Sequence, residues 1–272
     1  RDYDPDTDPS FAYKYAVDRL VVGLQHGSWV LWLLGCGDEA VAMEKRLNRH
    51  ANANPYPYSY AQALTSGASV HVMRRDAATM LARAEAGLAY ARARGREVWV
   101  DHGEFWIGWA RSELGEPERG LALMERAFER YTGHGSGSSL PKFLGLIAET
   151  LLRLGRTEEA ARAIEAALER IVSHGERCFH AECLRIRAAV MHRRGEDRAA
   201  VETVLREAIA LARRQKALGW ELRAARDLAA LGPGDGAAAA RLLADVCARM
   251  TQGRDTPDYR EAQAVLAAAG AA

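Results

Sequence analysis

The stretch Leu144–Ala160, with the sequence LGLIAETLLRLGRTEEA, contains the pattern that decides the fold of this 272-residue chain. Its first half places apolar residues at i, i+3, i+4 and i+7, the spacing of a helix with one apolar face. Gly155 then ends the apolar run, and glycine readily takes the left-handed backbone that closes a helix. Acidic residues from Glu158 onward favour the first turn of a new helix. The stretch therefore predicts two helices joined by a tight turn.

The same turn recurs at intervals of forty residues. Arg75, within MRRDAA, stands where one glycine of the series would fall, and we predict that it forms the same turn. Small residues before and after each turn, such as Gly108 and Gly120, predict that paired helices approach closely. No segment of useful length alternates apolar and polar residues, so we predict an all-α fold. The glycines of the series are Gly35, Gly115, Gly155 and Gly195.

Each predicted hairpin has an apolar face that it cannot bury alone, so stacking of hairpins would form the core. We predict a right-handed α-solenoid of about six hairpins with capping helices. The first helices are expected at 20–34, 58–74, 99–114, 140–154, 178–194 and 219–231. The second helices are expected at 38–50, 77–94, 117–131, 157–173, 197–215 and 237–250. We expect one domain over 1–272: an N-terminal segment or cap at 1–19, with room for a helix from Pro9, hairpins at 20–250, and a capping helix within 251–272, at about 257–269.

Composition excludes several classes of protein. Lys and Arg number 37 against 36 Asp and Glu, a formal charge of +1, which argues against direct nucleic-acid binding. No apolar run of about 18 residues exists, so we expect no membrane span. The chain begins with neither Met nor a signal-peptide pattern, and we expect a cytoplasmic fragment of a longer protein. Its four cysteines lack zinc-finger spacing and are expected to be reduced.

Three short motifs resemble sites of chemistry. The sequence GHGSGSS at 133–139 resembles a phosphate-binding loop, but no strand precedes it, and we interpret it as a joint between hairpins. His180-Ala181-Glu182 lacks the cysteine pair that zinc deaminases add. Asp101-His102-x-Glu104 is expected in the opening turns of a helix, where acidic residues are favoured. We therefore expect no catalytic residue, no metal site and no cofactor, and predict that the chain is not an enzyme.

The repeat register and four segments of the sequence resemble known proteins. The Leu-Gly and Ala register resembles the tetratricopeptide repeat, whose usual period is 34 residues. WVLWLLGCGDEA at 29–40 is similar to the LWLLG-x-x-DQA segment of a large bacterial family. GERCFHAECL at 175–184 and REAIALARRQKALGWELRAARDLAAL at 206–231 resemble two further segments of that family. TQGRDTPDYREAQAVLA at 251–267 resembles its closing segment, departing from it at Gln252, Arg254 and Tyr259.

Members of that family join an N-terminal class III adenylate/guanylate cyclase or winged-helix domain to an AAA/STAND-type ATPase and a C-terminal tetratricopeptide region. The resemblance implies that this chain is the C-terminal region. The ATPase motif G-x-x-x-x-G-K-[ST] does not occur in it. The resemblance also implies a concave groove lined by the first helix of each hairpin. Carried over residue by residue, the candidate binding residues are Gln25, Trp29, Trp32, Gln62, His102, Phe105, Trp109, Glu149 and Arg185.

The predicted groove is aromatic and amide-rich in its N-terminal half and charged in its C-terminal half. This composition favours an interaction or regulatory sensing module that binds a protein, a peptide, or the ATPase and cyclase domains of its own parent. One alternative is a small-molecule receptor, with its pocket in the first three repeats. Another is a structural or oligomerising scaffold that uses apolar end helices (237–243 and 262–269). The region around Tyr13–Tyr15 offers a further alternative for Trp29 and Trp32, which it would cover as ordinary cap packing.

Overall fold

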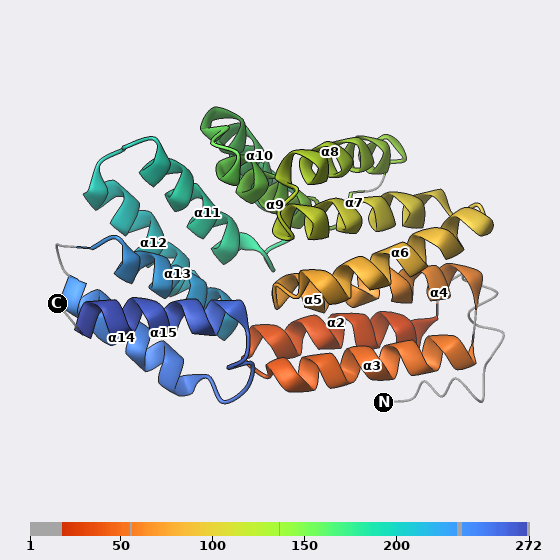
Figure 1. Ribbon diagram of the computed structural model, residues 1–272, viewed down its shortest axis with the longest axis horizontal. Coiled ribbons are helices and arrows are strands. Elements are labelled where there is room, and N and C mark those ends of the chain that lie inside the picture. The colour runs from red at the N-terminus through yellow and green to blue at the C-terminus, as the bar shows by residue number, and fades with distance from the viewer. Residues whose placement is uncertain (1–17, 55, 136, 233–235, 271–272) are drawn as a thin grey trace. The chain divides into compact units, whose positions relative to one another are not determined.

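A computed structural model describes residues 18–54, 56–135, 137–232 and 236–270, and all structural statements concern these residues. Their regular elements are helices, with no strand among them (Figure 1), which confirms the all-α prediction. Most of the expected N-terminal cap, including the helix from Pro9 and the Tyr13–Tyr15 region, lies outside the described residues. Residue contacts divide the chain into two compact units, which are described separately.

The N-terminal unit comprises Arg1–Trp32 and Cys36–Ser136. In its first helices, Val21, Leu24 and Leu47 are buried in one apolar cluster. Helix α7 packs between α6 and α8 and contributes a long run of buried residues. Its elements are α2 (Arg19–Leu33), α3 (Gly37–Ala53), α4 (Pro57–Leu64), η1 (Ser66–Ser69), α5 (Val70–Met73), α6 (Ala77–Ala93), α7 (Glu97–Glu113) and α8 (Pro117–Gly133).

The C-terminal unit comprises Leu33–Gly35 and Gly137–Ala272. Helices that follow one another in the sequence pack together. In addition, alternate helices are in contact: α9 touches α11, α11 touches α13, and α13 touches α15. Leu205, Leu222 and Leu243 belong to its main apolar cluster. Its elements are α9 (Leu140–Arg153), α10 (Thr157–His174), α11 (His180–Arg193), α12 (Arg198–Arg214), α13 (Leu218–Ala230), α14 (Gly236–Arg249) and α15 (Pro257–Gly270).

The turns that follow the first helices of the first five helix pairs repeat the same hydrogen bond. In each, a backbone N–H donates to the carbonyl five residues earlier, the bond of a Schellman motif. Arg75 adopts φ +57°, in the left-handed region, as the repeat predicts for a turn that lacks its glycine. The donor and acceptor pairs are Cys36 and Leu31, Asp76 and His71, Glu116 and Arg111, Arg156 and Leu151, and Glu196 and Met191, at 2.8–3.1 Å.

Close approach of paired helices is confirmed for α7 and α8. A Cβ atom at Gly108 would lie 2.7 Å from the carbonyl oxygen of Gly120, and one at Gly120 would overlap the backbone of Gly108. Such distances leave no room for a side chain. The small residues identified in the sequence are therefore required here by packing.

The expected continuous helix over 58–74 is wrong, because the structure breaks it at Thr65 into α4, η1 and α5. The Thr65 hydroxyl donates to the Ala61 carbonyl oxygen at 2.8 Å, and the Ser69 hydroxyl donates to the Ser66 carbonyl oxygen at 2.8 Å. Side chains that bond the backbone compete with regular helix hydrogen bonds, and Gly67 adds flexibility to the same stretch. The other expected helices agree with the structure to within three residues at each end.

Candidate functional site

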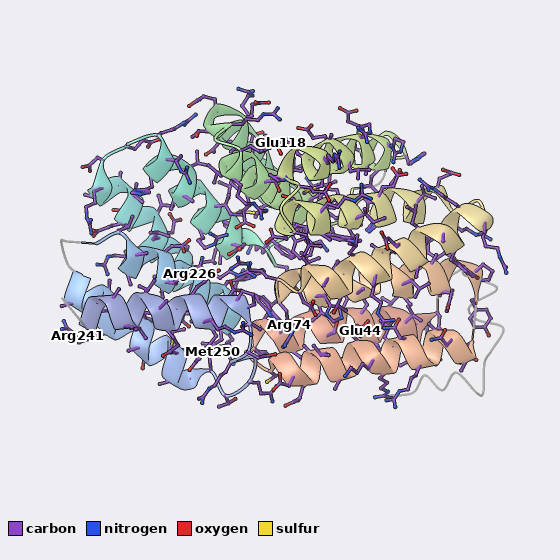
Figure 2. All side chains as sticks on the ribbon, viewed as in Figure 1. Glu44, Arg74, Glu118, Arg226, Arg241 and Met250 are labelled. Carbon is purple, nitrogen blue, oxygen red and sulfur yellow. The ribbon has the colours of Figure 1, made fainter. Side chains whose placement is uncertain are left out.

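A continuous series of ion pairs runs across the first helices α9, α11 and α13 of the C-terminal unit to its last helix, α15, and we call it the ladder. Its cations are Arg185 on α11 and Arg223 and Arg226 on α13, of which Figure 2 labels Arg226. Its anions are Glu149 on α9, Glu182 on α11, Asp227 on α13, and Asp258 and Glu261 on α15. The ladder thus connects all four of these helices.

Arg185 is the centre of one half of the ladder. It donates from Nε and Nη2 to the two carboxylate oxygens of Glu182, each at 2.9 Å, and from Nη1 to Asp227 Oδ2 at 2.9 Å. Its Nη2 also donates to Glu149. One guanidinium therefore ties α11 to α9 on one side and to α13 on the other, and charge-assisted bonds of this kind are the strong ones.

Arg223 and Arg226 continue the series to α15. Arg223 donates from Nη1 to Glu182 and from Nε to Asp258, both at 2.7 Å. Its guanidinium also lies 5.0 Å from the ring of Trp220. Arg226 donates to Glu261 at 2.5 Å. The second guanidinium, Arg223, therefore occupies a buried position with a carboxylate on each side and an aromatic ring beside it.

The buried pair at the centre of the ladder, Glu182 and Arg185, is held in its ionised form. Burial raises the pKa of Glu182, but the nearby Arg185 and Arg223 outweigh it and place this pKa below the ordinary value. Burial likewise opposes the charge of Arg185, while Glu182, Glu149 and Asp227 raise its pKa well above the ordinary value. Groups whose pKa values lie this far from neutrality are poor proton donors or acceptors at physiological pH.

The solvent-facing edge of the ladder is acidic. The side chains of Glu149, Asp227 and Glu261 are 29%, 25% and 44% exposed, whereas those of Arg185 and Arg223 are buried. Five carboxylates stand against three guanidinium groups within the ladder. The arginines therefore act as internal supports, and the carboxylates are the groups that solvent or a partner meets.

Two of the candidate residues from the sequence, Glu149 and Arg185, are members of the ladder and contact each other. The remaining members of α13 and α15 were not among the candidates. The spacing of 41 residues between Glu182 and Arg223 is the signal that could have found them. This spacing is one residue longer than the forty-residue repeat. Adding forty residues to Glu182 therefore leads to Leu222 and misses Arg223.

Gln25 and Gln62 are brought together in the N-terminal unit. The Gln62 amide donates from Nε2 to Gln25 Oε1 at 2.9 Å, and Gln25 Nε2 lies 3.4 Å from the Ser66 hydroxyl. All three residues are buried. This amide network spans the break after α4, where the backbone leaves regular helix geometry.

The aromatic candidates lie deeper than a surface groove would place them. Phe105 and Trp109 are each only 2% exposed, and Trp32 is also buried. His102 is buried with its ring 4.9 Å from that of Tyr131 and 5.0 Å from that of Trp99. Trp29 is half-buried and packs edge-on against His26 at 5.0 Å. In this structure the aromatic rings serve mainly as core packing.

A buried carboxylate in the N-terminal unit, Glu44 (Figure 2), was also not among the candidates. Asn48 donates to it, Arg83 Nη2 lies 3.3 Å from its Oε1, and His71 Nε2 lies 3.8 Å from its Oε2. Burial raises the pKa of Glu44, but the nearby His71 and the charge of Arg83 outweigh it, and the pKa is lowered. The residue is therefore a structural anion that links α3, α5 and α6.

Lys142, at the start of α9, is a buried cation. Its Nζ lies 5.6 Å from the ring centre of Phe143 and 5.7 Å from that of Phe179. Burial lowers the pKa of Lys142 to about 8, against the opposing effects of Cys178 and Glu176. Aromatic faces offset part of the cost of burying an ammonium group, and the lowered pKa shows that the cost is not fully offset.

The short motifs have structural partners. Ser139, which ends the GHGSGSS stretch, takes φ +62° and donates its backbone N–H to Glu176 at 3.0 Å. Asp101 lies in the second turn of α7 and accepts from Arg130 Nε at 2.7 Å, so its main partner is an arginine of α8. Among the described residues no cluster of His, Cys, Asp and Glu has the arrangement to hold a metal ion.

The described helices include none with the length and apolar character needed to cross a bilayer. Neither the known protein families nor the curated protein sequences give a match to the chain.

Proposed function

We propose that the chain is a cytoplasmic, non-catalytic binding module that holds a peptide or a partner domain against the first helices of its hairpins. In this proposal it is a tetratricopeptide-like, right-handed solenoid of about six hairpins. Two observations support it: the identical turns at forty-residue intervals, and the row α9, α11, α13 and α15 in the C-terminal unit. Successive first helices that contact one another present a continuous surface, which is how helical repeats bind partners.

The observation that carries the proposal is the acidic edge of the ladder. Glu149, Asp227 and Glu261 are partly exposed while arginines beneath them fix their positions. Carboxylates that are already ordered lose little conformational freedom when a partner binds. Their charge favours a segment that carries lysine or arginine, through electrostatic complementarity.

Selection of binders from a random dodecapeptide display library tests this proposal. We expect the selected peptides to be enriched in lysine and arginine, and their affinity to fall as salt is raised. The double variant Glu149→Gln, Glu261→Gln should weaken the best peptide by about tenfold or more, which corresponds to about 1.4 kcal/mol. Glu207→Gln, at an exposed position of α12, is the matched control. Selection of peptides without cationic residues would contradict the proposal.

We further propose that the module belongs to a multidomain signalling ATPase or cyclase and transmits partner binding to it. The four sequence segments that resemble such proteins support this part. The reading frame upstream of the chain tests it directly, because a cyclase or winged-helix domain followed by an ATPase domain should precede the first residue. An unrelated upstream domain would overturn the family placement and leave the peptide-binding test unaffected.

A further inference from the structure

A small cavity of about 190 Å³ opens between α11, α12 and α13 in the C-terminal unit. Its walls are mostly apolar, with Ala189, Leu205 and Ala230 among them. Only two of its lining residues are polar, Asp227 and His192. An open apolar hollow with a single carboxylate in its wall resembles a ligand site in which one polar group orients an apolar body.

Asp227 retains capacity to accept a further hydrogen bond. Its Oδ1 accepts from Arg226 Nε and Nη2 at 2.9 and 2.7 Å, and its Oδ2 accepts from Arg185 Nη1 at 2.9 Å. A carboxylate offers roughly four acceptor sites. The three bonds to arginine therefore leave about one site for a donor, and the side chain is 25% exposed.

The charges around the cavity permit a cationic donor. Arg185 and Arg226 contact Asp227, but Arg185 is also bonded to Glu149 and Glu182, and Arg226 to Glu261. Carboxylates outnumber guanidinium groups within the ladder. Together with Asp227, the carboxylates bonded to these two arginines outnumber them, so the charges of Arg185 and Arg226 are already compensated before a cationic ligand reaches Asp227.

The volume of the cavity matches a short chain. A cavity of about 150 Å³ accommodates a molecule the size of benzene. The space beside Asp227 therefore fits an unbranched chain of about four to six carbons, with its polar end at the carboxylate.

We propose that this cavity binds an alkylammonium group, whose methylene stem lies between α11, α12 and α13 and whose N–H donates to Asp227. The group could be supplied by a free primary amine or by a lysine side chain. The inference goes beyond the proposed function, because it holds for a free amine without any partner protein.

Methyl NMR of the full 272-residue chain at about pH 8 tests the site with n-pentylamine, 1-pentanol and pentanoate. We expect pentylamine to shift the Ala189 and Ala230 methyl signals saturably. We expect at least about tenfold weaker binding of pentanol and no saturable shift with pentanoate. Equal binding of pentanol and pentylamine would overturn the proposal, because the carboxylate would then contribute nothing.

Two variants separate the apolar and charged parts of the site. Ala230→Leu enlarges an exposed wall residue and should abolish binding of pentylamine, whereas Ala210→Leu, the same change on the exposed side of α12, should leave it unchanged. Asp227→Asn should weaken pentylamine about tenfold and leave pentanol unaffected. If the Ala230→Leu variant still binds pentylamine, the amine binds outside this cavity and the proposal is overturned.

The two sources of the ligand are separated by comparing cadaverine, a free diamine, with the capped peptide acetyl-Ala-Lys-Ala-amide. Comparable affinity of the peptide identifies a lysine side chain as a ligand, and binding of cadaverine alone identifies a free amine. Saturable shifts with neither compound would overturn the proposal. These results do not depend on the peptide selection, so failure of one proposal is distinguishable from failure of the other.

Discussion

Arg223 Nη1 lies 2.7 Å from Glu182 Oε1 although 41 residues separate them, and both side chains are buried. The same guanidinium reaches Asp258 on α15, so one side chain on α13 joins its two neighbouring helices. Buried ion pairs give little stability relative to well-packed apolar residues, but loss of one partner leaves an uncompensated charge. The ladder therefore fixes how these helices align and makes that alignment sensitive to substitution.

Replacement of Arg223 should expose that sensitivity. Arg223→Met removes one charged partner of Asp258, and Glu182 then keeps only its pair with Arg185. We expect a loss of about 3 kcal/mol in the free energy of unfolding. Urea denaturation measures it. Arg194→Met is the control, because the pair of Arg194 with Glu158 lies on the surface and should contribute no measurable stability. Equal losses in both variants would show that burial of the ladder has no energetic role.

The burial of Lys142 predicts a rise in stability at alkaline pH. Its pKa is about 8 in the folded protein and 10.5 when unperturbed, so the unfolded chain binds more protons between these values. Stability should therefore increase as pH rises from about 8 to 10.5, and the penalty is fully present below that window.

Lys142→Met should remove this rise and stabilise the protein at neutral pH by an amount on the order of 3 kcal/mol or less. Thermal unfolding at a series of pH values measures both effects. Lys45→Met, at an exposed position of α3, should leave the pH dependence unchanged. An unchanged profile in Lys142→Met would mean that the buried amine carries no penalty.

The contact between α7 and α8 predicts that even one methyl group is too large there. Gly120→Ala would place Cβ 2.8 Å from Ser112 Cβ and against the backbone of Gly108, so the helices must separate. We expect a loss of about 1–3 kcal/mol, as for other overpacked cores. Gly133→Ala, where nothing lies within 4 Å, should be neutral or slightly stabilising. Chemical denaturation of the two variants side by side distinguishes packing from a general intolerance of alanine.

The amide pair Gln25 and Gln62 predicts strong coupling between the two positions. Gln62→Met removes the donor to Gln25 Oε1 and leaves that buried oxygen unsatisfied, which should cost about 1–3 kcal/mol. The double variant Gln25→Met, Gln62→Met should recover part of this loss, because Gln25 Oε1, the acceptor that the single change leaves without a donor, is then also absent. Strictly additive losses in a double-mutant cycle would contradict the pairing.

The sequence predicted the helices because they depend on local patterns. Apolar spacing marked the helix faces, and the turn at Arg75 followed from its place in the forty-residue series, even without glycine. The break at Thr65 was not predicted, because hydroxyl groups that bond the backbone compete with the helix only weakly and their effect depends on packing. The candidate site was predicted in part: Glu149 and Arg185 were identified, but their joint contact and its continuation through Arg223 were not.

By itself, the sequence determined that this protein is helical, where its hairpins turn, and which small residues allow paired helices to touch. These features arise within one hairpin, where bonds and contacts link residues close in the chain. Only the tertiary structure decided that Phe105 and Trp109 are buried and that Glu182 meets Arg223. Those outcomes depend on the rotation and offset of helices about forty residues apart, and a change of one residue in a connecting turn brings a different side chain into contact.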